Sequence, residues 1–293
     1  MNFQWYPGHM TKAKRQMQED IRLIDLVIEL IDARVPLASR NPDIDELAKG
    51  KARLILLNKS DLADEQVTRA WEEYFMENSI NVCVINSRNN ADMKKIEQVV
   101  KQACAAKIER DRKRGIRNRP VRAMVVGIPN VGKSTFINTY AKKAATKTGN
   151  KPGVTKGKQW IRLSGTLELL DTPGILWPKF EDQSVGLKLA LIGSIKDEIM
   201  NTEELALELI KMLDASYPGR LNDYYSLENV DTAELTSQFD REVAPEVVTL
   251  WKIAKVKGSI KSGGEVDIEK AARLLLENFR NGKIGRFSLE APE

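Results

Sequence analysis

The chain has little cysteine and little histidine, with 2 cysteines and 1 histidine among 293 residues. Two cysteines are too few for a disulfide framework or a zinc site, so we expect a reducing compartment and a core position for Cys83 and Cys104. No apolar run approaches the length of a membrane span, and the first ten residues lack the apolar segment of a signal peptide. We therefore expect a cytoplasmic protein with no membrane partner.

One motif organises the rest of the chain. Residues Gly127 to Ser134 match G-x-x-x-x-G-K-S and follow the apolar run Val121–Val126. A strand that ends in this turn lets backbone amides surround a polyphosphate, with Lys133 reaching the β- and γ-phosphates and the Ser134 hydroxyl on Mg²⁺. The dipole of the following helix also favours phosphate at its N-terminus. The expected nucleotide contacts in this P-loop are Asn130, Val131, Gly132, Lys133, Ser134 and Thr135.

A second motif selects the base. Asn58-Lys59-Ser60-Asp61 follows the apolar run Arg53–Leu57 and matches Asn-Lys-x-Asp, the guanine-selecting element of GTPases. The Asp61 carboxylate can accept two hydrogen bonds from guanine, whereas adenine offers no such donor pair and leaves the carboxylate unpaired. Asn58 either binds near the base edge or ties this loop to the P-loop, and the Lys59 stem stacks on the ring. Together with the P-loop, this motif predicts that the chain binds GTP and GDP.

Three further short motifs complete a GTPase set. Asn86 and Ser87 follow a strand-like run, at the position where GTPases close a loop over guanine through backbone amides. Thr155 ends a Pro-Gly-Val-Thr sequence typical of the first switch, where the threonine hydroxyl joins Mg²⁺ and its amide touches the γ-phosphate. Asp171 and Gly174 match D-x-x-G, in which the aspartate holds Mg²⁺ through water and the glycine amide senses the γ-phosphate.

These motifs resemble those of GTPases related to translation factors, but their order differs. The guanine motif precedes the P-loop here, whereas ordinary members have the P-loop first. The chain is therefore similar to circularly permuted GTPases associated with ribosome assembly, over essentially its full length. The resemblance implies an α/β fold, in which a circularly permuted P-loop GTPase domain with a doubly wound, mostly parallel sheet precedes an all-α C-terminal domain. We expect a monomer.

The expected division of the chain follows from the same patterns. Residues 1–24 form an N-terminal segment with an amphipathic helix, residues 25–200 the GTPase domain, and residues 203–293 a helical domain. Strands are predicted at 25–33, 53–57, 81–85 and 121–126, a hairpin at 159–163 and 166–170, and helices at 64–78, 93–114, from 203 onward, 246–254 and 267–278.

Basic residues are unevenly placed although the net charge is only +5. Three runs contain most of the clustered charge: Lys107, Arg110, Arg112, Lys113, Arg114, Arg117, Arg119 and Arg122; Lys142, Lys143, Lys147, Lys151, Lys156 and Lys158; and Lys252, Lys255, Lys257 and Lys261. A single run is as often a solvated helix face, but three favour a polyanionic partner.

The resemblance implies that this partner is the large (50S) ribosomal subunit or its precursor, with rRNA as a contact of the helical domain. GTP would then mark the bound state, and hydrolysis would trigger release. The alternative is a GTP-controlled, protein-binding signalling switch whose basic runs are solvated faces. A metabolic enzyme that uses GTP is a third class, for which no additional nucleophile, metal cluster or substrate motif is present.

The catalytic element is not settled by the motifs. Many GTPases place glutamine directly after D-x-x-G to orient water, but this chain has Ile175, which predicts slow hydrolysis without a partner. Besides Lys133, Thr155 and Gly174, His9 is a candidate, because its ordinary pKa of about 6.5 suits proton handling. Alternatively, His9 belongs to a structural turn or contacts RNA. Asn130 matches the asparagine with which potassium-activated GTPases bind K⁺, or it is a simple loop residue.

Overall fold

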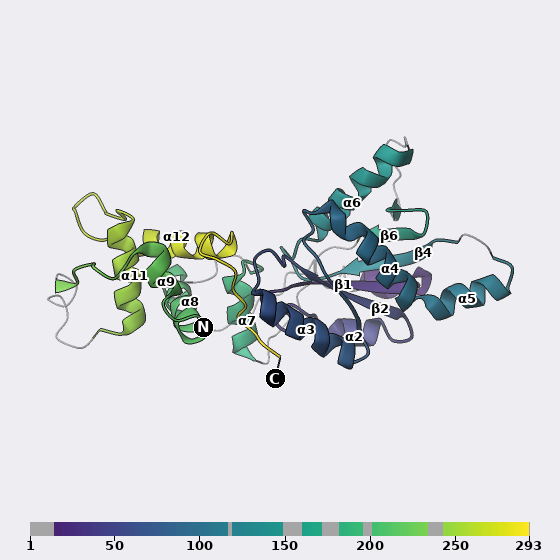
Figure 1. Ribbon diagram of the computed structural model, residues 1–293, viewed down its shortest axis with the longest axis horizontal. Coiled ribbons are helices and arrows are strands. Elements are labelled where there is room, and N and C mark those ends of the chain that lie inside the picture. Colours follow the sequence, from purple (N-terminus) through teal and green to yellow (C-terminus); the bar gives the residue numbers. More distant parts are fainter. Residues whose placement is uncertain are drawn as a thin grey trace.

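The computed structural model describes residues 15–116, 119–148, 160–171, 182–195, 201–233 and 243–292. The molecule is elongated, with a sheet and its covering helices at one end and a group of helices at the other (Figure 1). Helix α7 (Gln183–Leu191) lies between the two parts.

The sheet has six strands in the order β3-β2-β1-β4-β6-β5. They are β1 (Leu26–Asp32), β2 (Ala52–Asn58), β3 (Asn81–Val84), β4 (Val121–Val126), β5 (Trp160–Arg162) and β6 (Leu167–Asp171). All neighbours pair in parallel except β5 and β6, which form the expected antiparallel hairpin. Every residue of β1 is buried, as expected for a parallel strand covered on both faces. The predicted mostly parallel sheet is confirmed.

The strand order sets the geometry of the site. The strand of the guanine motif, β2, precedes the P-loop strand, β4, in the chain, and β1 lies between them in the sheet. Because the carboxyl ends of parallel strands meet at one edge, the loops after β1, β2, β3 and β4 gather there. A site built from strand ends is thus assembled whichever strand comes first in the chain, which is why a permuted order is tolerated.

Helices lie on both sides of the sheet (Figure 1). The helices in this part of the molecule are α2 (Asp43–Leu47), α3 (Glu65–Glu77), α4 (Met93–Ala103), α5 (Ala105–Lys113) and α6 (Lys133–Thr148), together with the short 3-10 helices η1 (Ile21–Leu23) and η2 (Asn90–Asp92). Helix α3 begins where predicted because the Asp64 side chain accepts hydrogen bonds from the amides of Gln66 and Val67.

The helix predicted over residues 93–114 is divided in two at Cys104. This buried residue has φ −104 and ψ 14, outside the helical range, and its burial confirms the expected core position. Beyond Cys104 the chain loses its apolar face, and Lys107 instead forms ion pairs with Asp25 and Asp111, each at 3.2 Å. Helix α5 therefore projects away from the sheet (Figure 1).

The other end of the molecule is helical, which confirms the expected helical C-terminal region. It comprises α8 (Thr202–Ser216), α9 (Arg220–Tyr225), α11 (Pro245–Val256) and α12 (Ile268–Arg280). Helix α8 buries Leu205, Leu209 and Leu213 at the spacing of one helix face. Its start is fixed by Asn201, whose side chain accepts from two backbone amides. Across the described parts of the chain, every helix is too short or too polar to cross a bilayer.

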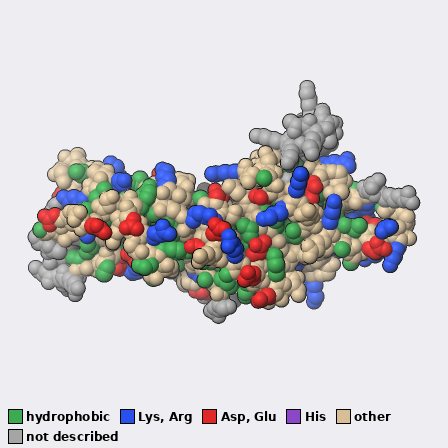
Figure 2. Space-filling view, viewed as in Figure 1, with side chains coloured by type: hydrophobic (Ala, Val, Ile, Leu, Met, Phe, Trp, Pro, Cys, Tyr) green, Lys and Arg blue, Asp and Glu red, His purple; other side chains and the backbone are tan. Residues whose placement is uncertain are grey.

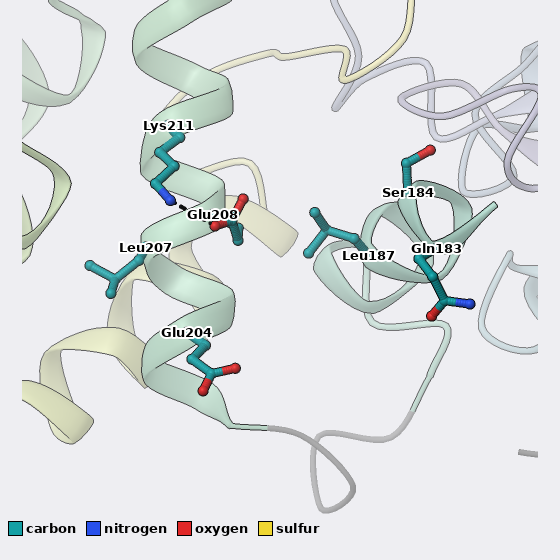
Figure 3. A pocket seen from close by; sticks show the side chains of 7 residues that line it. All are labelled: Gln183, Ser184, Leu187, Glu204, Leu207, Glu208 and Lys211. Atoms are coloured by element: carbon teal, nitrogen blue, oxygen red, sulfur yellow. Dashed lines mark hydrogen bonds and ion pairs between the residues drawn. The ribbon is translucent and has the colours of Figure 1, made fainter. Parts of the chain in front are cut away.

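A groove of about 510 Å³ separates α7 from α8 (Figure 3). It is lined by Gln183, Ser184 and Leu187 of α7 and by Glu204, Leu207, Glu208 and Lys211 of α8. Lys211 forms an ion pair with Glu208 at 2.8 Å across one turn of α8. The groove marks the junction of the two parts of the molecule and contains none of the predicted nucleotide contacts.

After α12 the chain returns to the sheet. We call residues Arg286–Glu290 the C-terminal strap. The Leu289 amide donates to the Arg34 carbonyl at 2.8 Å, and the Phe287 amide donates to the Leu62 carbonyl at 3.0 Å. Sequence patterns assign these residues to the helical domain, yet these bonds join them to the loops after β1 and β2, a path visible as the yellow segment in Figure 1.

Candidate functional site

A single buried amide joins three loops at the edge of the sheet. Asn58 is 1% exposed at the end of β2. Its Nδ2 donates to the Val131 carbonyl of the P-loop at 2.7 Å, and its Oδ1 accepts from the Ser87 amide at 2.9 Å and from the Ser87 hydroxyl at 2.7 Å. Of the two roles left open by the sequence, this bond corresponds to tying the guanine loop to the P-loop.

A buried carboxylate supports the next residue of the guanine motif. Lys59 Nζ donates to the Asn130 carbonyl at 2.9 Å and lies 3.0 Å from Asp32 Oδ2. Asp32 ends β1, is fully buried, and also accepts from the Nε and Nη2 atoms of Arg34, each at 2.9 Å. Burial alone raises the pKa of the Asp32 carboxyl, but the charges of Arg34 and Lys59 and their hydrogen bonds outweigh it and hold that pKa well below its usual range.

Asp32 contacts Lys59 of the guanine motif and Arg34 contacts Asp32, and sequence reasoning missed both residues. The sequence gives one weak signal, which is that Asp32 directly follows the apolar residues Leu30 and Ile31 at the end of β1. An acidic residue in this place is also common at the ends of ordinary strands. The strand order explains why Asp32 and Arg34 lie beside the motif loops, since β1 lies between β2 and β4 and its carboxyl end meets the loops that follow both.

The P-loop has the close contacts that its glycines permit. A Cβ atom added to Gly132 would lie 2.4 Å from Asn58 Nδ2, and one added to Gly127 would lie 2.5 Å from the Leu30 carbonyl oxygen. Lys133 is 8% exposed, and its Nζ donates to the carbonyls of Gly127 at 3.1 Å and Ile128 at 3.3 Å. A lysine over the loop at the N-terminus of α6 makes an anion-binding site.

The remaining P-loop residues divide between core and surface. Val131 is fully buried, while Ser134 and Thr135 are exposed in the first turn of α6. Asn130 is exposed, has φ 59, and donates through Nδ2 to the Gly193 carbonyl at 2.8 Å. The P-loop therefore contacts the residues directly after α7.

The residues expected around the base lie in the loops after β2 and β3. Asp61 is exposed, and the Ser60 amide donates to the Ile85 carbonyl at 3.3 Å. The second loop was expected to contact guanine through backbone amides. Here the Asn86 amide donates to Asp92 at 3.1 Å and the Ser87 amide to Asn58, so both are engaged within the protein.

Four predicted residues are described in part or not at all. Asp171 ends β6 and pairs in register with Val125 of the P-loop strand, which brings the start of D-x-x-G beside the P-loop, while its side chain lies outside the described part. His9, Thr155 and Gly174 lie outside the described residues. Of the three side chains predicted to hold Mg²⁺, the described part includes only that of Ser134.

Known proteins are similar to this chain in sequence and in fold. A family described as 50S ribosome-binding GTPase matches residues 122–239. A Bacillus cereus protein named Ribosome biogenesis GTPase A is 46% identical over 294 residues, which cover 100% of this chain and 95% of that protein. The chain belongs to the ribosome biogenesis GTPase A family. It is a GTPase, and the expected circular permutation is confirmed.

Solved structures agree with this family assignment. The structure of GNP-bound YlqF from T. maritima matches with a TM-score of 0.66 and 29% identity, covering 96% of this chain and 99% of that one. The GDP-bound structure of the T. maritima protein matches with a TM-score of 0.64 and 28% identity, covering 95% and 99%. These findings support the predicted binding of GTP and GDP by this member of the ribosome biogenesis GTPase A family.

Proposed function

We propose that this GTPase is an assembly factor for the large (50S) ribosomal subunit. It binds the precursor subunit and its rRNA with GTP bound, and hydrolysis releases it. The observation that carries this proposal is the full-length similarity to a protein named for ribosome biogenesis. The family description of 50S binding favours the large subunit over the small one. The protein acts as a monomer in the cytoplasm.

Charge on two surfaces supports an RNA partner. Exposed basic residues on α5 and just beyond it are Arg110, Arg112, Lys113, Arg114 and Arg119. Basic side chains gather over the projecting end of this helix (Figure 2). Neutralising rRNA phosphates there would release counterions, which gives binding a strong dependence on salt.

The second basic surface is at the end of α11. Lys255 Nζ lies 5.0 Å from the centre of the Trp251 ring and Lys257 Nζ lies 5.4 Å from that of Tyr225, so these lysines pack along aromatic faces. Lys257 and Lys261 are exposed and Lys252 is partly exposed. We propose that this end of the helical region is a further rRNA contact.

We propose the following roles within the nucleotide site. Asp61 selects guanine, while Lys133 and the amides of the P-loop hold the phosphates. Ser134, Thr155 and Asp171 hold Mg²⁺, which would neutralise charge between the β- and γ-phosphates, and the Gly174 amide senses the γ-phosphate. The exposure of Ser134 in the first turn of α6 and the position of the Asp171 backbone beside β4 support this arrangement.

Slow hydrolysis without a partner is part of the proposal, because Ile175 cannot orient water. His9 is our candidate for that task, and Asn130 is the candidate K⁺ ligand. Single-turnover hydrolysis by His9→Ala and by Asn130→Ala, in potassium and in sodium buffer, separates the two roles. Loss of the potassium effect in Asn130→Ala alone would assign K⁺ binding to that residue.

The proposed function is tested by sedimentation with purified ribosomal subunits. We expect the protein to sediment with large subunits in the presence of a non-hydrolysable GTP analogue and to remain in the supernatant with GDP or with small subunits. Binding that is equal for both subunits, absent from both, or independent of the nucleotide would overturn the proposal.

A further inference from the structure

The loop that carries Asp61 is held from outside by the C-terminal strap. The Phe287 amide donates to the Leu62 carbonyl at 3.0 Å, and Ser288 Oγ accepts from the Asp64 amide at 3.2 Å. Arg286 adds two bonds, from Nε to the Ala63 carbonyl at 2.7 Å and from Nη2 to the Ser60 carbonyl at 3.0 Å. The strap therefore bonds to the backbone on both sides of Asp61.

The strap is itself firmly anchored. The Glu290 carboxylate accepts from the amides of Leu37 at 2.8 Å and Ala38 at 3.2 Å, and Lys188 Nζ donates to it at 3.1 Å. The Glu290 carbonyl accepts from Trp71 Nε1 at 3.1 Å. Phe287 is 2% exposed, so apolar packing secures the other end of the strap. A segment fixed at both ends can act as a rigid support.

The loop needs such a support. Lys59 has φ 58, a backbone conformation that residues other than glycine rarely adopt. The Leu62 amide donates to the Lys59 carbonyl at 2.9 Å, which closes a tight turn. Asp61 is exposed at the tip of this turn, where its direction depends on the backbone on either side. Recognition of two donors on a base edge requires the carboxylate to be held within about 0.5 Å and 10–20° of its working position.

We infer that the C-terminal strap positions Asp61 for guanine recognition, with Arg286 as the main positioning residue. The inference rests on the role of Asp61 proposed above. The Arg286 side chain is 46% exposed, and its third nitrogen, Nη1, lies 3.5 Å from Glu65. The ion pair between Arg286 and Glu65 is exposed and contributes little to overall stability, so the main effect of Arg286 is on the loop to which its two other nitrogens bond. Arg286 supplies a fork of donors to two carbonyls, which lysine cannot reproduce.

The test compares binding of GDP and of inosine diphosphate. The hypoxanthine base lacks the 2-amino group of guanine. The Kd for inosine diphosphate divided by the Kd for GDP therefore reports the second hydrogen bond to Asp61. Because a hydrogen bond to a charged group is worth about 1.5–3 kcal/mol, we expect the wild-type protein to prefer GDP by about tenfold or more.

Replacing Arg286 lowers this preference. In Arg286→Ala we expect the ratio to fall about threefold or more, chiefly through weaker GDP binding, and in Arg286→Lys to fall less. In the double variant Arg286→Ala with Ser288→Ala, we expect the ratio to fall further than in Arg286→Ala alone. Arg273→Ala is the matched control, because Arg273 forms an exposed ion pair with Glu269 on α12, and it keeps the wild-type ratio.

Three results would overturn the inference in distinguishable ways. A ratio that stays within twofold of wild type in both Arg286→Ala and the double variant shows that the strap does not position Asp61. An equal rise of both Kd values shows that the strap acts only on the fold as a whole. If the wild-type protein binds GDP and inosine diphosphate equally well, the proposed role of Asp61 in guanine recognition is wrong.

Discussion

Replacing Asn58 by alanine removes a side chain that joins three loops of the nucleotide site. The substitution leaves the Val131 carbonyl, the Ser87 amide and the Ser87 hydroxyl without their present partner. Each buried polar group that loses its partner costs about 1–3 kcal/mol, and water entering the space left by the amide offsets part of this cost. We therefore expect the free energy of unfolding to fall by about 2–5 kcal/mol.

The assay is thermal unfolding of the nucleotide-free protein, followed by circular dichroism. A loss of this size corresponds to a decrease in Tm on the order of 5–15 °C. Asn78→Ala is the control, because Asn78 is exposed at the end of α3 and its Nδ2 donates to the Tyr74 carbonyl at 2.8 Å. If Asn58→Ala unfolds within 2 °C of Asn78→Ala, the reasoning about the buried amide is refuted.

Three further predictions concern charge, sterics and salt. The lowered pKa of Asp32 contributes stability that is complete above the unfolded-state pKa of about 3.9 and is lost as pH falls toward the folded-state pKa. The difference in unfolding free energy between wild type and Asp32→Asn should therefore narrow in urea denaturation below pH 4, and a constant difference would contradict this. Gly132→Ala places a Cβ atom 2.4 Å from Asn58 Nδ2, on a residue whose φ of +105 side-chain-bearing residues rarely adopt. Calorimetry should therefore find that this variant binds GDP at least about tenfold more weakly than wild type. Gly165→Ala is the control and should bind GDP normally, because a Cβ atom there has nothing within 4 Å. Arg112→Ala combined with Lys113→Ala should reduce the slope of log Kd against log salt for large-subunit binding by about 2, and an unchanged slope would exclude α5 as an rRNA contact.

Much of the fold was predictable from local patterns. Apolar runs such as Val121–Val126 became strands, because a strand buried on both faces needs a nearly continuous apolar sequence, which Arg122 interrupts here only once. The motif residues lie at strand ends, and parallel pairing brings those ends to one edge of the sheet. The contact between Asn58 and the P-loop follows from this rule.

What sequence reasoning missed depends on contacts between distant residues. The buried charge cluster of Asp32, Arg34 and Lys59 requires knowledge that β1 lies between the two motif strands. The strap contacts join residues such as Arg286 and Ser60, which are 226 positions apart. The periodicity of apolar residues along the chain gives no information about contacts over such a separation. The break at Cys104 was missed because the helical pattern continues through it and only the apolar face ends there.

Action on the large ribosomal subunit is the part of the proposed function on which the rest depends. The most direct measurement is the rate of GTP hydrolysis with purified large subunits, with small subunits and with neither, in potassium and in sodium buffer. We expect large subunits to raise kcat by about tenfold or more, with no comparable effect of small subunits. A rate that is the same with and without large subunits in both buffers would contradict it.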